Sequence, residues 1–552
     1  MITFRANMRF SILKKTSPSD APDGVRIPSP DQDEEKAVSS EQESDGENDE
    51  TQYPSFKIAF PTIIAIYLAA FLVSLDRTIV GVAVPKISDQ FKSFGDISWY
   101  ESGYLLTFCA SGLPLGRVYT IFPPKWVFIT VIALFEIGSI ISAAAPSSIA
   151  FIVGRAISGL GGGGTFSGAQ ILLVGLVPLQ KRAKYTGFLG AVFGLSSVIG
   201  PLMGGAFTSK VTWRWCFWIN VPIGGASIIL LAWLMPNSPP AIRVKGSTLD
   251  KLRRLDPIGT IILVPGLVCL VLALQYGANK YTWSDARVIA LLVVGCILLL
   301  CFGGVQVYLK DEATVPTRIF TQRSIFLGFF ISLCVGSVLV NVPFYLPIWF
   351  QAIKGVSAVD AGIRLLPYFM GSVITVISCG IIISKTGYYT PWLIAGTAIM
   401  IAGSALLTTL RVNTGTGDWI GYQILVGAGT GMALQQTSNA ANTVLSPKDI
   451  PIGVTIIQFA NIAGSTVFVS VCQAILSSTL KLGLAGSGID PSIIVHAGAT
   501  DIRTLVGKDK LQLVLEAYNL GVDRLFYVSV GLSSLAFVCS LFMEWKSMKT
   551  SS

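Results

Sequence analysis

Four ionisable side chains stand inside long apolar runs of this sequence, and they are the residues best placed to do chemistry. They are Asp76 with its neighbour Arg77, then Glu136, and then Arg155. A charged side chain at the centre of a bilayer costs about 2.5–3.5 kcal/mol on insertion scales, so each of the four marks a site with a partner or a task. A buried carboxyl group keeps its proton when it is isolated and releases it beside an Arg. A carboxylate that exchanges an Arg partner for a proton can therefore couple a change of shape to proton movement.

We predict that Asp76 carries the proton and that Arg155 is its switching partner. The alternative for these two residues is a static buried ion pair. Glu136 is a further candidate for proton coupling, although its place near the middle of an apolar run favours a static pair or a polar contact between helices.

The composition indicates what kind of protein holds these groups. Of 552 residues, 52% are hydrophobic and 13% are charged, against about 25% charged in an ordinary soluble domain. From Ile58 onward, apolar runs alternate with short charged joints, and a run of about 20 residues spans the hydrocarbon layer of about 30 Å. We count fourteen runs and predict an all-α polytopic membrane protein with fourteen transmembrane helices.

Several classes of function are excluded. The one histidine, His496, and nine widely separated cysteines argue against a zinc cluster, a bis-His haem or a disulfide framework. Residues 159–164 are Gly-rich but continue with Thr165 and Phe166 in place of Lys and Ser or Thr, so they do not form an ATP-binding loop. Basic residues stand singly between apolar runs, unlike those of a nucleic-acid-binding face. We predict no cofactor, no metal, no nucleic acid and no enzymatic activity. The expected partners are a small-molecule substrate, protons and the lipid bilayer, and the expected unit is a monomer.

The charges also predict how the chain is divided. Residues 1–57 hold 7 Lys or Arg and 12 Asp or Glu, with too little apolar surface to fold. Joints after even-numbered spans carry fifteen Lys or Arg, and those after odd-numbered spans carry nine when the long joint before the last span is left out, which predicts that both termini lie in the cytosol. We predict a disordered acidic tail (1–57), an N-terminal six-helix bundle (58–234) and a linker with two extra transmembrane helices (235–323). A C-terminal six-helix bundle (324–544) and a cytosolic tail (545–552) follow. The C-terminal bundle includes an outer loop (480–523), in which residues 508–518 could form an amphipathic helix on the surface.

A faint internal repeat supports two related bundles. Shifting the chain by 266 positions superposes Gly161 on Gly427 and Gly163 on Gly429, with few further matches. Transporters are commonly built from such repeats.

The fifth span predicts a tight helix crossing with a bend. Gly200 and Gly204 have the spacing that lets helix backbones approach closely, and Pro201 removes one helical hydrogen bond. Gly194 and Gly205 extend the stretch of small residues on either side.

Four segments together resemble a known family. Residues 75–85 (LDRTIVGVAVP) look like the first-span signature of the major facilitator superfamily, in its fourteen-span drug:proton antiporter group. Residues 154–159 (GRAISG) resemble its fourth-span signature, and residues 194–205 its antiporter signature. Residues 213–224 (WRWCFWINVPIG) look like the joint before span 6 in toxin efflux pumps of filamentous fungi. The signatures stand in the right order, and the match covers nearly everything after the tail.

The sequence departs from the family pattern at two places. The joint between spans 2 and 3 reads GRVYTIFPPK over residues 116–125, with Thr120 where the family carries an Asp. A charge relay through this joint is therefore in doubt. Ser196 replaces an earlier Gly of the antiporter signature, and its small side chain still allows close packing.

The resemblance implies proton-driven export of a hydrophobic or amphiphilic small molecule, such as a fungal secondary metabolite, toxin or drug. We expect the plasma membrane as its location, with the vacuolar membrane as the alternative. Polar and aromatic residues of the inner spans suit an amphiphilic ligand, although each could equally make a hydrogen bond between helices. The candidate substrate-binding residues are Gln170, Asn341, Tyr345, Trp349, Gln435, Gln436, Asn439, Gln458 and Asn461.

Two other functions remain open on sequence alone. The substrate could be a siderophore or a basic amino acid, although a dicationic substrate would need more carboxylates within the membrane than Asp76 and Glu136. A non-transporting membrane receptor would need no titratable switch.

Overall fold

The structure is a computed structural model that describes residues 53–93, 96–237, 239–240, 251, 254–279, 281–484 and 508–549. Residues 1–52, which make up most of the predicted acidic tail, lie outside the described residues, as does His496. All that follows concerns the part of the chain from Tyr53 onward.

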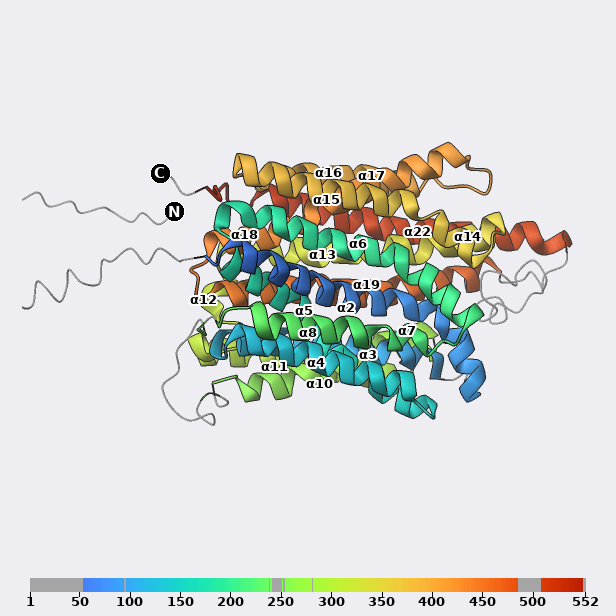
Figure 1. Cartoon of the computed structure of the whole chain (residues 1–552). Helices are drawn as coiled ribbons and strands as arrows, with labels where there is room; N and C mark the ends of the chain where they lie inside the picture. Colours follow the sequence, from blue (N-terminus) through green and yellow to red (C-terminus); the bar gives the residue numbers. More distant parts are fainter. Residues whose placement is uncertain are drawn as a thin grey trace, which may run out of the picture. The chain divides into compact units, whose positions relative to one another are not determined.

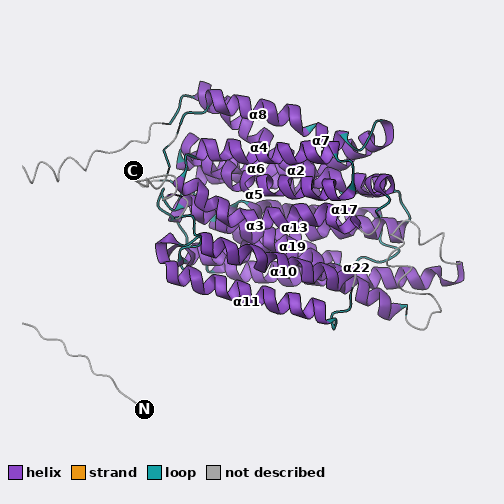
Figure 2. Ribbon diagram, turned by 90° about the horizontal axis from the view of Figure 1, so that it is seen from below, coloured by secondary structure: helices purple, strands orange, loops and turns teal. Residues whose placement is uncertain are grey.

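The described residues form helices joined by short loops (Figure 2). Twelve of these helices, or helical runs that join two of them, are long and apolar enough to cross a membrane. The helices α3 and α17 are not among the twelve. The first helices are α2 (Phe56–Phe91), α3 (Ile97–Ile121), α4 (Pro124–Ala144), α5 (Ser148–Leu176), α6 (Leu179–Lys210), α7 (Trp215–Trp218) and α8 (Asn220–Leu234). Next come α10 (Pro257–Asn279), α11 (Ala286–Leu309), η3 (Lys310–Glu312) and α12 (Thr317–Phe320). The last are α13 (Arg323–Lys354), α14 (Ala358–Ile363), α15 (Leu366–Thr386), α16 (Thr390–Leu407), α17 (Thr416–Leu434), α18 (Gln436–Val444), α19 (Ile450–Gly483) and α22 (Lys508–Leu541).

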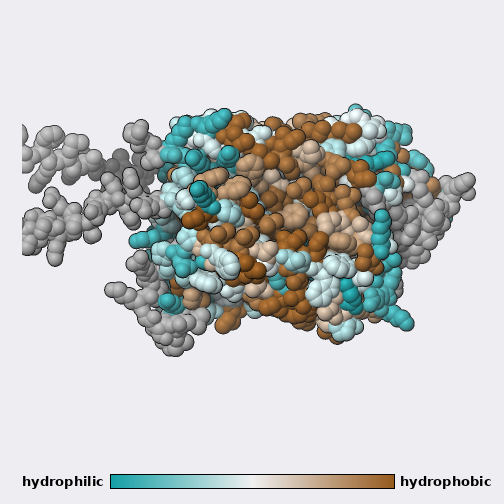
Figure 3. Space-filling view, viewed as in Figure 1, coloured by the Kyte–Doolittle hydropathy of each residue, from teal (hydrophilic) through white to brown (hydrophobic). Residues whose placement is uncertain are grey.

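The long helices run roughly side by side between two ends (Figure 1). We call the end where α2 begins and α22 ends the near end, and the opposite end the far end. Apolar side chains gather in the middle of the face seen in Figure 3, and hydrophilic ones gather towards both ends. This distribution matches a bilayer, whose core admits helices because they satisfy their own backbone hydrogen bonds.

Two groups of helices pack in the same way. In the N-terminal helices, α5 lies against α3 and α4, and α2 lies against α6 and α8. In the C-terminal helices, α17 lies against α15 and α16, and α13 lies against α19 and α22. The order of helices along the chain is the same in both groups, so α5 corresponds to α17 and α6 to α19.

The glycines place the internal repeat in a register slightly different from the one expected. Gly161 faces α4, whereas Gly427 faces α15, so these two are not equivalent. Gly159 faces α3 as Gly427 faces α15, and Gly161 faces α4 as Gly429 faces α16. The shift that superposes glycines with equivalent neighbours is therefore 268 positions, from Gly159 to Gly427. The helix that each glycine contacts defines the repeat, whereas identical residues at a shift of 266 positions do not.

The two groups touch closely at the near end. A side chain at Gly187 of α6 would collide with the backbone of α15 around Gly380, and one at Gly116 of α3 would collide with Thr455 of α19. Towards the far end, a cleft opens between residues 197–209 of α6 and residues 362–369 of α14 and α15. The small residues therefore allow close packing at the near end, whereas a cleft lies between α6 and the α14–α15 segment towards the far end.

The helices α10 and α11 pack against each other, and α10 also lies against α3 and α19. At the near end, Arg117 of α3 donates hydrogen bonds to the backbone oxygens of Arg254 (3.4 Å) and Asp311 (3.0 Å). Arg318 donates two hydrogen bonds to Asp449, at 2.8 and 2.9 Å, and these hold the pKa of the Asp449 carboxyl below its usual range. The linker is thus tied to both groups of helices.

The structure differs from the expected loop 480–523 at both of its ends. The helix α19 continues to Gly483, and α22 begins at Lys508 and runs without a break to Leu541. Residues 508–518 are therefore the first turns of a long helix, not a separate surface helix, and Val514, Leu515, Ala517 and Tyr518 in this stretch are buried. Residues 485–507 lie outside the described residues.

We predict that Gly187→Val opens the near end, because the added side chain meets the backbone of α15 at Val376 and Gly380. Spin labels on the exposed Lys184 and Lys385 would report a longer distance than in the wild type. Gly303→Val is the matched control, since nothing lies near that position. An unchanged distance in Gly187→Val would show that this crossing does not keep the near end closed.

Candidate functional site

Asp76 of α2 and Arg155 of α5 form an ion pair inside the N-terminal helices. The guanidinium Nη1 lies 2.5 Å from Asp76 Oδ2, and both side chains are almost completely buried, at 1% and 0% exposure. The predicted partners are therefore in contact, and the carboxyl faces the interior of the protein instead of lipid. Burying two charges is expensive unless each also has further hydrogen bonds.

Those further contacts are present. Arg155 Nε donates to the backbone oxygen of Tyr100 (3.1 Å), and the guanidinium lies over the Tyr104 ring, 4.3 Å from its centre. Asn220 of α8 donates to Asp76 Oδ1 at 3.4 Å and to Ser139 Oγ at 3.2 Å. Four helices thus hold the pair.

Small residues explain how the pair comes together. Gly159 and Gly163 put α5 directly on the backbone of α3, and Gly161 puts it on α4. Helix backbones approach this closely only where side chains are absent. The close packing sets Arg155 deep between α3 and α2, within reach of Asp76.

Glu136 of α4 lies near this pair without bonding to it. The side chain is 6% exposed, and neither carboxylate oxygen has a hydrogen-bond partner among the described residues. Gly224 of α8 leaves the space that this carboxyl fills, and the charge of Asp76 acts on it. A buried acid without a partner is costly when ionised, so Glu136 is well placed to hold a proton.

A cavity lies between the two groups of helices. Arg77, Phe108, Phe166 and Phe193 line it from the N-terminal side. The other side comes from α13, α17 and α19 and includes Ser332, Gln435, Gln458, Asn461 and Ser465. Asp76 itself does not line the cavity; it sits behind Arg77, because adjacent residues of a helix point about 100° apart.

The structure brings some of the candidate substrate-binding residues to this cavity and places others elsewhere. Gln435, Gln458 and Asn461 line it, and Gln170 donates a hydrogen bond to Gln435 Oε1 at 3.0 Å. Asn341 is buried, and its amide has no hydrogen-bond partner among the described residues.

Two other amides lie at the near-end seam, not at the cavity. Asn439 accepts a hydrogen bond from Thr186 of α6 (3.1 Å) and donates one to Gln436 (3.0 Å). These residues therefore connect the two groups of helices.

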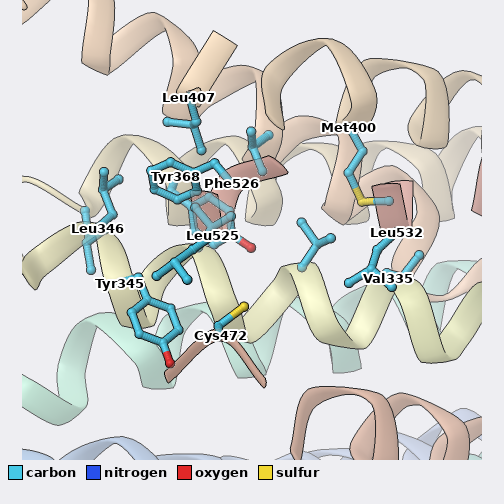
Figure 4. Close-up of a cluster of buried hydrophobic side chains, with 14 of the residues drawn as sticks. Val335, Tyr345, Leu346, Tyr368, Met400, Leu407, Cys472, Leu525, Phe526 and Leu532 are labelled. Carbon is cyan, nitrogen blue, oxygen red and sulfur yellow. The ribbon is translucent and has the colours of Figure 1, made fainter. Parts of the chain in front are cut away.

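Tyr345 and Trp349 belong to the core of the C-terminal helices. The Tyr345 hydroxyl donates to the backbone oxygen of Val469, and its ring packs among apolar side chains (Figure 4). Trp349 donates to Asn519 of α22 at 2.9 Å. Both are completely buried, and neither is among the residues that line the cavity. The apolar run around them gave no signal of which helix face looks inward.

The antiporter signature lies along α6 between two neighbours. Gly200 faces Thr78 of α2, and Gly194 faces Val373 of α15, while Pro201 and Gly205 line the far-half cleft. Gly204 is buried in the same helix. This stretch therefore connects the helix that carries Asp76 to the seam between the two groups.

Thr120, at the family's acidic position, donates only to the backbone oxygen of Arg117 within its own helix, at 2.7 Å. The Thr120 side chain is neutral, so this joint lacks the acidic group of the family pattern. Arg117 nonetheless still connects this joint to the linker, as described above.

Sequence reasoning missed the cavity role of Arg77 and its two aromatic neighbours, Phe108 and Phe193. The sequence did contain an indication of this role. Arg77 directly follows Asp76 in a helix, and two neighbouring residues cannot both face Arg155. Among the described residues, no group of three or more His, Cys, Asp or Glu could hold a metal ion.

The parallel helices, the apolar middle and the cavity between two similarly packed groups define a membrane transporter fold. Residues 66–469 match the family model described as Major Facilitator Superfamily, and the chain belongs to this superfamily. It is 44% identical to "MFS-type transporter VdtG" of Byssochlamys spectabilis over 90% of each chain. It is 43% identical to "Rubrofusarin-specific efflux pump aurT" of Gibberella zeae, over 91% of this chain and 92% of that one. Among solved structures, the proton:xylose symporter XylE has the same fold, with a TM-score of 0.58 and 14% identity over 90% of this chain and 98% of that one.

We predict that Asp76 and Arg155 are strongly coupled in stability. Asp76→Asn alone leaves a buried guanidinium unpaired, which costs about 3–5 kcal/mol, whereas Asp76→Asn with Arg155→Gln removes both charges. A double-mutant cycle on unfolding in detergent should therefore be far from additive.

The exposed pair of Arg318 and Asp311, at 60% and 76% exposure, is the control, with an expected coupling of about 0–1 kcal/mol. Equal coupling energies in the two cycles would contradict the close buried contact.

Proposed function

We propose that this protein exports hydrophobic or amphiphilic small molecules, such as a fungal secondary metabolite, toxin or drug, in exchange for protons. Relatives over most of the chain support export, since one of them is named as a rubrofusarin-specific efflux pump. The observation that carries the proton part is the buried ion pair between Asp76 and Arg155.

The topology we propose has fourteen membrane spans. The twelve long apolar helices make up twelve of these spans, and the helices α3 and α17, which contain more polar residues, make up the other two. Residues 58–234 and 324–544 are then two six-helix bundles, joined by a linker (235–323) with two extra spans, and flanked by tails at 1–57 and 545–552. The excess of Lys and Arg in the joints at the near end supports a cytosolic near end, with both termini on that side.

With the near end in the cytosol, the state that we propose for this structure is an outward-facing one. Two features support this state: the glycine contacts of α6 with α15 and of α3 with α19 pack the near end closely, and a cleft lies between α6 and the α14–α15 segment towards the far end. A monomer in the plasma membrane would alternate between this state and its inward-facing counterpart.

Asp76 is the proton carrier in this proposal. In this structure, the Asp76 carboxylate contacts the Arg155 guanidinium and the Asn220 amide. A proton that arrives from the open outer side neutralises Asp76 and frees Arg155, which must then find other partners. Because four helices meet at the pair, losing it changes how α2 and α5 pack. Glu136 would take a second proton or hold one as a relay.

We predict that Asp76→Asn abolishes substrate transport driven by a pH gradient in proteoliposomes, because an amide cannot bind and release a proton. Arg155→Ala should also fail, since the carboxylate then loses the partner that releases its proton. A substrate for this assay comes from testing the metabolites to which a deletion strain becomes sensitive.

Asp311→Asn is the matched control, since that carboxylate is exposed at the near end and should leave transport unchanged. Gradient-driven transport at wild-type rates in Asp76→Asn would refute the assignment of the proton site.

A further inference from the structure

The central cavity contains one charged group. Of the residues that line it, Arg77 alone carries a charge, and the others are apolar, aromatic, hydroxyl or amide side chains. Arg77 lies on α2 next to Asp76, but on the cavity side of the helix. The cavity is therefore positively charged at one point of its wall.

Within the described part of the chain, no anion is paired with the Arg77 guanidinium. Among the described residues, it forms no ion pair and no hydrogen bond, in contrast to Arg155. Two acids close to Arg77 do not pair with it. The Asp76 carboxylate instead contacts Arg155 and Asn220. Glu101 of α3 interacts with Arg77 electrostatically but forms no ion pair with it. Its five N–H donors thus face a cavity and not a partner.

Two aromatic rings hold the guanidinium in place. Its carbon lies 5.4 Å from the centre of the Phe108 ring and 6.0 Å from that of Phe193, and Phe108, Phe193 and Phe166 also line the cavity. A planar cation held against aromatic faces is stabilised while its donors stay available. The same faces offer area to a flat aromatic ligand.

Amides stand on the opposite wall. Gln435, between α17 and α18, and Gln458 and Asn461 of α19 line the cavity, and amides bind neutral oxygens and hydroxyls without adding charge. A ligand between the walls would thus meet a cation on one side and neutral polar groups on the other.

From this arrangement we propose that the cavity selects aromatic substrates that carry an acidic oxygen, a carboxylate or phenolate, which binds Arg77, and that it disfavours cationic amines. The inference rests on the proposed export function and specifies its substrate class. An anion would make charge-assisted hydrogen bonds with the fork of N–H groups, whereas an ammonium group would lie against a like charge in a medium of low dielectric constant.

Three ligands with the same ring and different charges test the proposal. Naphthoate is an anion, methyl naphthoate is neutral and naphthylmethylammonium is a cation. Calorimetric titration into the full-length purified protein in detergent, without any gradient, should give the tightest binding for naphthoate and the weakest for the ammonium. Equal affinities, a preference for the cation, or no binding of naphthoate would overturn the anion site.

Arg77→Gln should weaken naphthoate binding by about tenfold or more, as expected for a lost hydrogen bond to a charged group, and should abolish the preference for the anion. Arg77→Lys should keep the preference while weakening it, since the charge stays but the planar fork is lost. Arg287→Gln is the matched control, because that arginine also lies over an aromatic ring, at Tyr281, but is exposed and distant in sequence. Wild-type naphthoate affinity in Arg77→Gln would refute the role of Arg77.

The outcomes separate this inference from the proposed function. If Arg77→Gln does not elute as a folded monomer, the Arg77→Lys variant and the ligand series on the wild-type protein still test the anion site. If the wild-type protein transports under a pH gradient but binds the three ligands equally, the proposed export function stands and the proposed anion site is refuted. Charge-selective binding that depends on Arg77, without gradient-driven transport, keeps the anion site and loses proton coupling.

Discussion

The contact between Asp76 and Arg155 is the interaction on which the rest of this structure depends. Two opposite charges with almost no exposure persist in the interior only because each is paired and further hydrogen-bonded. Tyr100, Tyr104 and Asn220 supply those contacts from α3 and α8. The helices α2, α3, α5 and α8 are thus arranged around one pair of charges. The neutral form of either partner would fit this arrangement less well, and that makes the pair suitable as a switch.

Small residues carry the consequence of that switch to the seam between the two groups of helices. On α6, Gly200 faces α2 close to Asp76, while Gly187 faces α15 at the closed near end. The helix α6 therefore packs against α2 and also contacts α15 across the boundary between the two groups of helices. A bound proton at Asp76 can change the packing of α2, and α6 can pass the change to the crossing with α15, because a packed interface has few alternative arrangements.

Much of this was predictable from the sequence, and the physical reason is the bilayer. A membrane forces charges out of apolar runs, so Asp76, Arg77, Glu136 and Arg155 stand out in the sequence, and the pairing of Asp76 with Arg155 can be predicted from them. The helix limits followed from run length, as for α10 and α11. Which face of a helix looks into the cavity did not follow, because in a fully apolar run the periodicity is weak. That is why Tyr345 and Trp349 were expected at the cavity but lie in the core, and why the cavity role of Arg77 was missed. The exact register of the repeat also needed the structure, since it depends on which backbone each glycine faces.

The central claim is that Asp76 itself binds and releases a proton. Infrared difference spectroscopy on the purified protein during a pH titration tests this most directly, because a protonated carboxyl has its own C=O stretching band. We expect a band that appears on acidification, with a component from Asp76 that is lost in Asp76→Asn and persists in Glu136→Gln. An unchanged band in Asp76→Asn, across the pH range in which transport operates, would contradict it.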